Sequence, residues 1–391
     1  MKRIIVCCDG TWNAPDINNP KNNRPSNVLK MARAIKPLAS NGATVQVIEY
    51  IPGVGTFNKL DRWFGGMTGY GLSKNICRAY DFIANNYTPG DKIYLFGFSR
   101  GAYTARSLCG FMNKVGIIEK DKMHLLPEVF KFYNDKRNRK LDKYDFREML
   151  KNNDKTKDLW LYPEDIDVYP VHFLGVWDTV GSLGFPTPLL GKLSQHWIGF
   201  HNTDLAGNVT HAYQALALHE LRRLFRPSLW TSKKNYQSVE QVWFPGAHSD
   251  VGGGLKEPNE PDLASCPLRW MAEKARNTGL ELDWIYLNQF KYDNCQPFNE
   301  SRQRFYKLYP IDIRKIGCVE GIEQSISDMY INRIASRCHQ DYLNTLDKNI
   351  LDSYREIDGN SKKLRQTTLN ENICLGNLDI EGVVNDDPLA R

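Results

Sequence analysis

Short apolar segments recur along the chain, and helical patterns separate several of them. Each segment is rich in β-branched or aromatic residues and has the length of one strand. The segments are Ile4 to Cys8, Val45 to Ile51, Ile93 to Phe96, Val171 to Trp177 and Val239 to Phe244. Between the second and third segments, apolar residues at helical spacing run from Ile76 to Ala84. This alternation predicts an α/β fold with a mainly parallel sheet flanked by helices.

The third apolar segment leads into Gly97-Phe98-Ser99-Arg100-Gly101, and a proline-free stretch of helix formers follows from Ala102 to Met112. This order is typical of a nucleophile elbow, in which a sharp turn presents a strained serine at the carboxyl edge of a sheet. Small residues on both sides let the backbones approach closely. Ser99 is therefore the candidate nucleophile, and a structural Gly-Ser turn is the alternative.

A serine hydroxyl is a poor nucleophile at neutral pH, so Ser99 requires a base and a carboxylate that orients the base. Two later strand segments end near such residues, because Asp178 follows Trp177 and His248 comes shortly after Phe244. The carboxyl ends of parallel strands share one edge of a sheet, so the three side chains are expected to converge there. Their order along the chain, Ser then Asp then His, is that of α/β-hydrolases.

Acyl transfer also needs two hydrogen-bond donors for the oxyanion of the tetrahedral intermediate. The backbone N–H of Arg100 is the expected first donor, and the second is expected from the loop of Asp9, Gly10 and Thr11. A simple turn capped by Asp9 is the alternative for this loop. Asp9, Phe98 and Asp250 are expected to line the substrate pocket.

Several residues allow other interpretations. Asp250 is a second candidate for the orienting acid, although it lies two residues from His248 and fits better as a brace for the glycine-rich turn. The histidine and aspartates would bind a divalent metal if they converged, but no metal-ligand spacing is present, so no metal and no cofactor are predicted. Arg100 and Arg106 are placed to meet a substrate phosphate, with an ion pair to an acidic neighbour as the alternative.

Composition narrows the class of protein. The chain has 391 residues, and 51 basic against 45 acidic residues give a formal charge of +6, which is too small to argue for nucleic acid but is compatible with contact with anionic lipid. No signal sequence is recognisable, and no apolar run reaches the roughly 18 residues of a membrane span. We therefore expect a protein made in the cytoplasm. Nine scattered cysteines without a C-x-x-C pair indicate reduced thiols.

The strand and helix patterns suggest a catalytic core over residues 1–280 that carries two insertions. Residues 119–168, approximately, are highly charged with both signs and are expected to form a helical insertion at the surface. Residues 182–210, approximately, are irregular and apolar, which makes them a candidate lid or substrate wall, with a packed surface loop as the alternative. Residues 281–391 are expected to form a mainly helical C-terminal extension packed on the core.

Four ordered motifs resemble those of one family of uncharacterised α/β-hydrolases, which includes the first class of type VI secretion lipase effectors, bacterial phospholipases. The motifs are Cys8-Asp9-Gly10-Thr11-Trp12-Asn13, Gly97-Phe98-Ser99-Arg100-Gly101-Ala102, Trp177-Asp178-Thr179-Val180 and Pro245-Gly246-Ala247-His248-Ser249-Asp250-Val251-Gly252-Gly253-Gly254. The resemblance continues through Ala212 to Arg223 and Leu268 to Met271, so it covers roughly the first 280 residues.

The resemblance implies an α/β-hydrolase-like fold in which Ser99 attacks lipid ester bonds, His248 is the general base and Asp178 orients it. It also implies peripheral contact with a membrane, a secretion-machine or immunity-protein partner, and delivery by a system that needs no signal peptide. The chain departs from the family in being shorter and in carrying His219 where an acidic residue is expected. His219 shares an apparent helical stripe with Ala212 and is interpreted as a packed or surface residue.

The main hypothesis is a serine hydrolase that cleaves carboxylic esters of lipids or phospholipids through an acyl-enzyme. An esterase for small soluble substrates is one alternative. A non-catalytic module of the same fold that binds a lipid or a partner is the other.

Overall fold

A computed structural model of the protein describes most of the chain. The described residues are 1–11, 13, 24–53, 69–159, 161–162, 170–181, 204–303, 307, 310–314, 316, 322, 324–335 and 366–367. The candidate lid at 182–210 therefore lies largely outside them, and the described chain resumes at Asp204.

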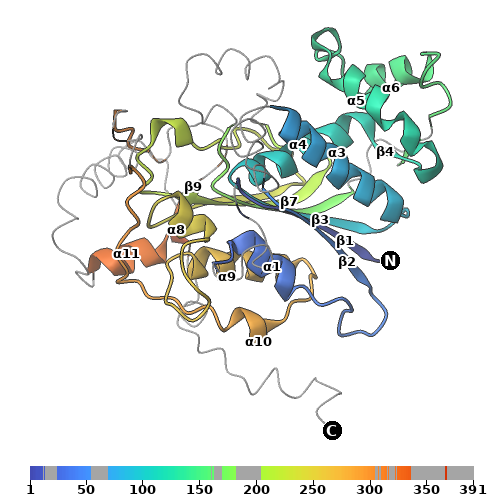
Figure 1. Ribbon diagram of the computed structural model, residues 1–391. Coiled ribbons are helices and arrows are strands. Elements are labelled where there is room, and N and C mark those ends of the chain that lie inside the picture. The colour runs from blue at the N-terminus through green and yellow to red at the C-terminus, as the bar shows by residue number, and fades with distance from the viewer. Residues whose placement is uncertain are drawn as a thin grey trace.

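The centre of the molecule is one sheet whose eight described strands all pair in parallel (Figure 1). Its strands are β1 (Arg3–Cys8), β2 (Gln46–Ile51), β3 (Lys92–Phe98), β6 (Val171–Trp177), β7 (Val209–Ala217), β8 (Ser238–Phe244), β9 (Gln324–Ser327) and β10 (Gln366–Thr367). Their order across the sheet is β10-β9-β8-β7-β6-β3-β1-β2. Because the chain runs from β1 to β2 and then back past β1 to β3, the order reverses between β1 and β3. Such a reversal opens a crevice at the carboxyl ends of the strands, where ligands bind in α/β sheets.

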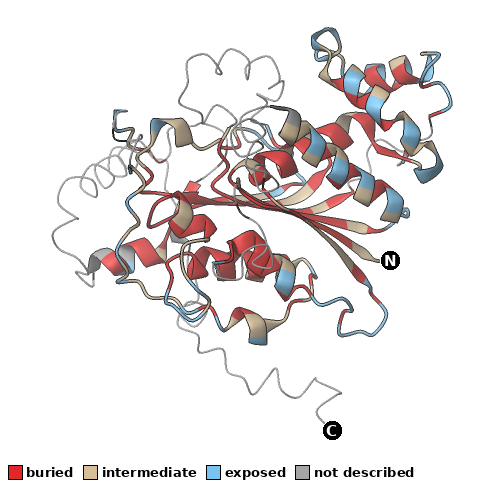
Figure 2. Cartoon of the chain, in the orientation of Figure 1, coloured by how far each residue is buried: buried red, intermediate tan, exposed pale blue. Residues whose placement is uncertain are grey.

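Helices cover both faces of the sheet, which accounts for the continuously apolar strands (Figures 1 and 2). One face carries α3 (Gly69–Asn86) and α4 (Arg100–Val115), and the other carries α1 (Asn27–Ala34), α9 (Ser265–Asn277) and α10 (Trp284–Leu287). Two hydrophobic cores result, one on each side. Cys8 lies in the first core and Cys7 in the second, and both are free thiols, as the alternation of a strand predicts.

The predicted α/β-hydrolase-like class is confirmed by this architecture, and all five predicted strands are present. One prediction is wrong, because the residues around Ala212, taken as a helical stripe, form the central strand β7. A strand buried on both faces is apolar at nearly every position, so helical spacings occur in it by coincidence.

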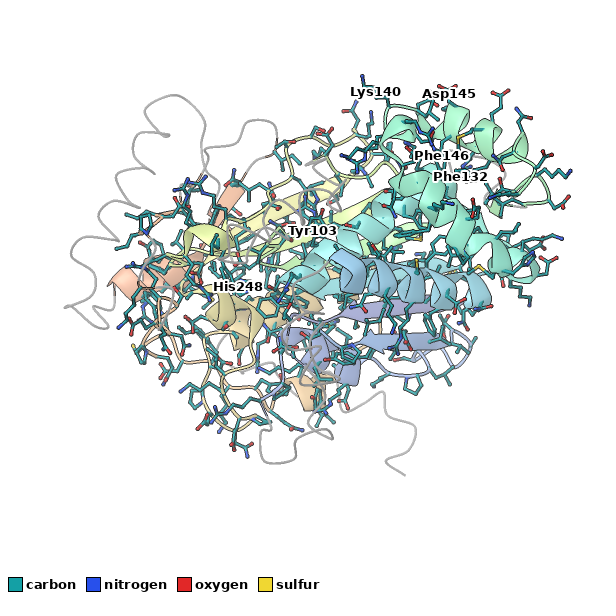
Figure 3. All side chains as sticks on the ribbon, turned by 45° about the horizontal axis from the view of Figure 1, so that its top comes forward. Tyr103, Phe132, Lys140, Asp145, Phe146 and His248 are labelled. Atoms are coloured by element: carbon teal, nitrogen blue, oxygen red, sulfur yellow. The ribbon has the colours of Figure 1, made fainter. Side chains whose placement is uncertain are left out.

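The charged insertion begins after α4. It contains β4 (Ile117–Ile118), α5 (Leu126–Asn134), α6 (Lys143–Lys151) and two 3₁₀ turns (Lys120–Leu125 and Lys136–Asn138), and β4 pairs with β5 (Leu161–Tyr162). Phe146 of α6 is fully buried against Tyr133 of α5. In the view of Figure 3 this insertion, marked by Phe132 and Phe146, lies on the far side of Tyr103 from His248.

The C-terminal region is joined to the sheet rather than set apart from it. Its described part contains α10, β9, α11 (Asp328–Ala335) and β10, and β9 pairs in parallel with β8. The sheet therefore runs across the predicted boundary at residue 280, and the extension supplies strands that the helical prediction did not include. In the described part of the chain, no helix is both long and apolar enough to cross a bilayer.

Candidate active site

Ser99 occupies the turn between β3 and α4 with a strained backbone. Its φ is 55° and its ψ is −120°, a conformation that residues with a side chain rarely adopt. Among the described residues other than glycine, only Ser99 and Asp178 have a positive φ. The Ser99 N–H donates to Trp177 O at 3.0 Å, which ties the turn to the end of β6.

The two glycines of the Gly-x-Ser-x-Gly motif are required by backbone contacts. A Cβ on Gly101 would lie 2.1 Å from Cys8 O and 2.5 Å from Asp9 O, at the end of β1. A Cβ on Gly97 would lie 2.6 Å from the Cα of Ala102. The first turn of α4 therefore packs directly on two strand ends, which is the close approach that the sequence predicts.

Gly101→Ala is expected to destabilise the protein by about 1–3 kcal/mol, because the new methyl group must displace backbone atoms. Gly110→Ala is the matched control on the same helix, since its Cβ would meet only Tyr133 Oη at 3.4 Å. That variant is expected to be neutral or slightly stabilising through helix propensity. Thermal unfolding measures both, and equal melting temperatures for the two variants would contradict the close packing of α4 on β1.

Asp178 and His248 meet at the carboxyl edge of the sheet. His248 Nδ1 lies 2.6 Å from Asp178 Oδ2, and both side chains are buried. The Ala217 N–H donates to Asp178 Oδ1 at 3.0 Å. Two predicted members of the triad are thus in direct contact through Nδ1 of His248, and Nε2 takes no part in that contact.

A further residue in this cluster, Arg314, is not predicted from the sequence. Its Nη1 donates to Asp178 Oδ1 at 2.5 Å and its Nη2 to Oδ2 at 3.0 Å. Burial alone would raise the pKa of Asp178, but the Arg314 charge and the hydrogen bond with His248 hold that pKa below its usual range. No motif signals Arg314, because its role depends on a contact between segments far apart in the chain.

The His248 ring is held by two aromatic side chains. Phe98 packs on it with ring centroids 4.6 Å apart, and Phe225 meets it edge-on at 5.1 Å. Phe98 has little freedom, because a Cβ on Gly252 would lie 2.0 Å from its ring. The predicted pocket residue Phe98 therefore also fixes the position of the predicted base.

Polar contacts hold the backbone of the His248 segment. Glu220 accepts from the His248 N–H at 3.3 Å and from the Arg222 guanidinium at 2.8 Å. Burial opposes ionisation of Glu220, but Arg222 keeps its pKa below the usual value. Since the two charges neutralise each other, this pair supports the His248 backbone without adding net charge to the site.

Asp250 and His219 brace the glycine-containing turn around His248. The Asp250 carboxylate accepts from the Ala247 N–H at 2.8 Å and from the side chain and N–H of Asn299, and burial raises the pKa of Asp250 to about 6. His219 Nδ1 accepts from the Gly246 N–H at 2.9 Å, and the ring stacks on Phe298. It is Asp178 that contacts the imidazole of His248, while the hydrogen bonds of Asp250 go to Ala247 and Asn299.

The loop after β1 lies beside the Ser99 turn, at the reversal point of the sheet. Asp9 accepts from the Gly10 N–H at 2.6 Å, from Ser26 Oγ at 2.5 Å and from Tyr50 Oη at 2.6 Å. Burial raises the pKa of Asp9, against these hydrogen bonds. Because the Gly10 N–H is already bonded, Thr11 is the better candidate of the two for an oxyanion donor.

Arg106 on α4 contacts β7 and the segment that precedes β8. Its guanidinium donates to Ser228 O and to Gln214 Oε1 at 3.3 Å, and it lies 4.9 Å from the Trp230 ring. No described carboxylate lies within ion-pair distance of it, so the ion pair expected as the alternative is not found there. Within the described residues no cluster of three or more histidine, cysteine or acidic side chains is suited to a metal ion.

The parallel sheet with its reversal point, and the strained serine turn between β3 and α4, define an α/β-hydrolase-like protein. Residues 2–274 match the family described as type VI secretion system (T6SS) phospholipase effector Tle1-like, catalytic domain. The chain belongs to this family.

The individual proteins that resemble this chain share between 16% and 27% sequence identity with it. The chain is 27% identical over 249 residues to an uncharacterized protein of Saccharomyces cerevisiae, a match that covers 59% of this chain and 33% of the yeast protein. Among solved structures, it is similar to an uncharacterized protein from Pseudomonas aeruginosa (16% identity, TM-score 0.38, 72% of this chain and 46% of the other). It is also similar to the Tle1 effector bound to the VgrG spike from the type 6 secretion system (20% identity, TM-score 0.33, 67% of this chain and 52% of the other).

The chain thus spans about a third to a half of the length of these relatives. The bacterial origin implied by the resemblance stays a prediction, since a relative occurs in yeast.

Proposed function

We propose that the protein is a serine hydrolase that cleaves carboxylic ester bonds of phospholipids through an acyl-enzyme. The observation that carries the proposal is the contact of 2.6 Å between Asp178 and His248, at the sheet edge where Ser99 is held with a φ of 55°. Membership of a family of phospholipase effectors supports the choice of substrate.

In the proposed reaction Ser99 Oγ attacks the ester carbonyl while His248 Nε2 takes the hydroxyl proton. Asp178 holds the His248 ring through Nδ1 and stabilises the imidazolium that forms. His248 then returns the proton to the departing alcohol, and water releases the fatty acid. For this step the Ser99 hydroxyl must come within hydrogen-bond reach of His248 Nε2.

The Arg100 and Thr11 N–H groups are proposed to stabilise the oxyanion, because each follows a strand end at the crevice. The proposed pocket lies between the Asp9 loop and the turn containing Phe98. Arg106, with no described acidic partner, is proposed to attract the phosphate of the head group. Its partners would then include a membrane surface and a secretion machine that delivers it.

Vesicles of a single synthetic phospholipid test this proposal directly. Wild-type protein is expected to release fatty acid from them, and a fluorophosphonate probe is expected to label Ser99, as peptide mass spectrometry would show. A soluble short-chain ester measured in parallel separates a phospholipase from a general esterase. Vesicle binding without hydrolysis and without labelling would contradict the proposal and favour a lipid-binding module.

A further inference from the structure

Arg314 forms a two-pronged contact with the proposed orienting acid. Each of its terminal nitrogens faces one oxygen of Asp178, at 2.5 Å and 3.0 Å, in the fork geometry that suits a carboxylate. The two side chains are 4% and 0% exposed. Such a buried contact is unlike the surface ion pairs of the molecule, since water does not screen it.

The guanidinium is held in place by groups other than Asp178. Nη1 also donates to Ala217 O at 2.7 Å, and Nη2 to Phe225 O at 2.5 Å. The same Phe225 packs its ring against His248. The position of Arg314 is therefore set by the ends of β7 and of the 3₁₀ turn Arg223–Phe225, and it can impose an orientation on the carboxylate.

The segment that carries Arg314 is anchored independently. Ile311 bridges to Arg222, and the Asp312 N–H donates to Leu221 O at 3.1 Å. Asp312 also forms an exposed ion pair with Arg226. Arg314 lies 136 residues after Asp178 and beyond residues 2–274, the part of the chain that matches the family.

We infer that Arg314 is a positioning residue of the acyl-transfer reaction, which fixes the Asp178 carboxylate so that Oδ2 faces His248 Nδ1. The inference rests on the proposed function. Four N–H donors surround the carboxylate: the Ala217 N–H, the His248 Nδ1–H and the two terminal nitrogens of Arg314. Together they hold it in a single orientation, in which Oδ2 accepts from the imidazole and Oδ1 accepts from the Ala217 N–H. A misplacement of about 1 Å at such a position costs on the order of 100-fold in rate.

Arg314 also balances the charge of the buried pair. Glu220 and Arg222 compensate each other beside His248, and the hydrogen bonds of Asp250 go to Ala247 and Asn299. Without Arg314 the Asp178 carboxylate would be an uncompensated buried charge, which is costly. Proton uptake by His248 relieves that cost, but a protonated imidazole cannot accept the proton of Ser99.

Arg314→Gln is the principal test, with Arg226→Ala as its matched control. Arg226 ties the same segment through Asp312 but does not contact Asp178. In the glutamine variant kcat for a soluble ester is expected to fall about 100-fold with KM nearly unchanged. The acid limb of its pH–rate profile is expected to move to higher pH. The control is expected to keep the wild-type kcat and profile.

Arg314→Lys separates charge from geometry and serves if the glutamine variant fails to fold. It keeps a cation but cannot bridge both carboxylate oxygens, so its acid limb should stay near that of the wild type while kcat remains reduced. Wild-type kcat in either folded variant overturns the inference. If fluorophosphonate labels the wild type and Arg314→Gln at equal rates, only the role of Arg314 fails. A wild-type protein that is not labelled at all overturns the proposed function together with it.

Discussion

Ser99→Ala is expected to abolish phospholipid hydrolysis, with a loss of kcat on the order of 10⁶-fold. The substitution removes the atom that is proposed to attack the ester and leaves the turn between β3 and α4 otherwise intact. Alanine has nearly the volume of serine, and Ser99 Oγ makes no hydrogen bond to a described residue. The melting temperature should therefore change little, and binding to vesicles should persist.

Ser249→Ala is the matched control for this prediction, because Ser249 adjoins His248 but is not part of the proposed reaction. It should retain most of the activity and the fluorophosphonate labelling. Fatty acid release measured on highly purified protein checks both variants, since trace contamination would mask a large loss. Turnover by Ser99→Ala close to the wild-type rate would exclude Ser99 as the nucleophile.

Asp178→Asn is expected to lower kcat by about 10⁴-fold. The amide would present its NH₂ to His248 or leave the ring in the wrong tautomer, so Nε2 could no longer accept the Ser99 proton. Because the contacts of Asp178 hold its pKa below the usual range, the wild-type carboxylate is ionised throughout the working pH range. The amide of the variant does not titrate, so no change of pH near neutrality should restore its activity.

The same substitution also affects stability, since it leaves the Arg314 guanidinium buried without its counter-charge. A loss of about 3–5 kcal/mol is expected, measurable by denaturant unfolding. Asp250→Asn is the comparison, because its amide oxygen can still accept the hydrogen bonds from the Ala247 and Asn299 N–H groups, which both go to Oδ2. If Asp250→Asn proved to be the inactive variant and Asp178→Asn remained active, the orienting acid would be Asp250.

The sequence predicts most of the features that depend on local patterns. Strand runs such as Ile93 to Phe96 are recognisable because burial on both faces demands apolar residues throughout, and the glycines around Ser99 reflect contacts made within one turn. The same burial conceals β7, whose alanines match a helical spacing as well as a strand. A local pattern predicts the type of element only where it fits the periodicity of a strand or of a helix but not both.

Features that depend on tertiary contacts are not predictable in this way. Arg314 lies in a stretch without any recognisable motif, and contacts of its neighbours Ile311 and Asp312 with Arg222 and Leu221 hold it near Asp178. Strand β9 has four residues, too few for a periodicity to be counted. Residue types alone also do not show that the Gly10 N–H already donates to Asp9. That hydrogen bond leaves the Thr11 N–H as the better candidate for the second oxyanion donor.

The pairing of β3 with β6 determines how the positions of the proposed nucleophile and the proposed orienting acid tolerate changes elsewhere in the chain. Phe98 pairs with Trp177, and Ser99 and Asp178 directly follow these two strand ends, where the Ser99 N–H donates to Trp177 O at 3.0 Å. Their proximity follows from the pairing of the two strands and does not depend on loop length. His248 is carried by a short helix after β8, so insertions and deletions in loops near it can move the proposed base without moving Ser99 and Asp178. A designer who wished to alter the chemistry of this site while preserving its proposed nucleophile should therefore vary the segment after β8.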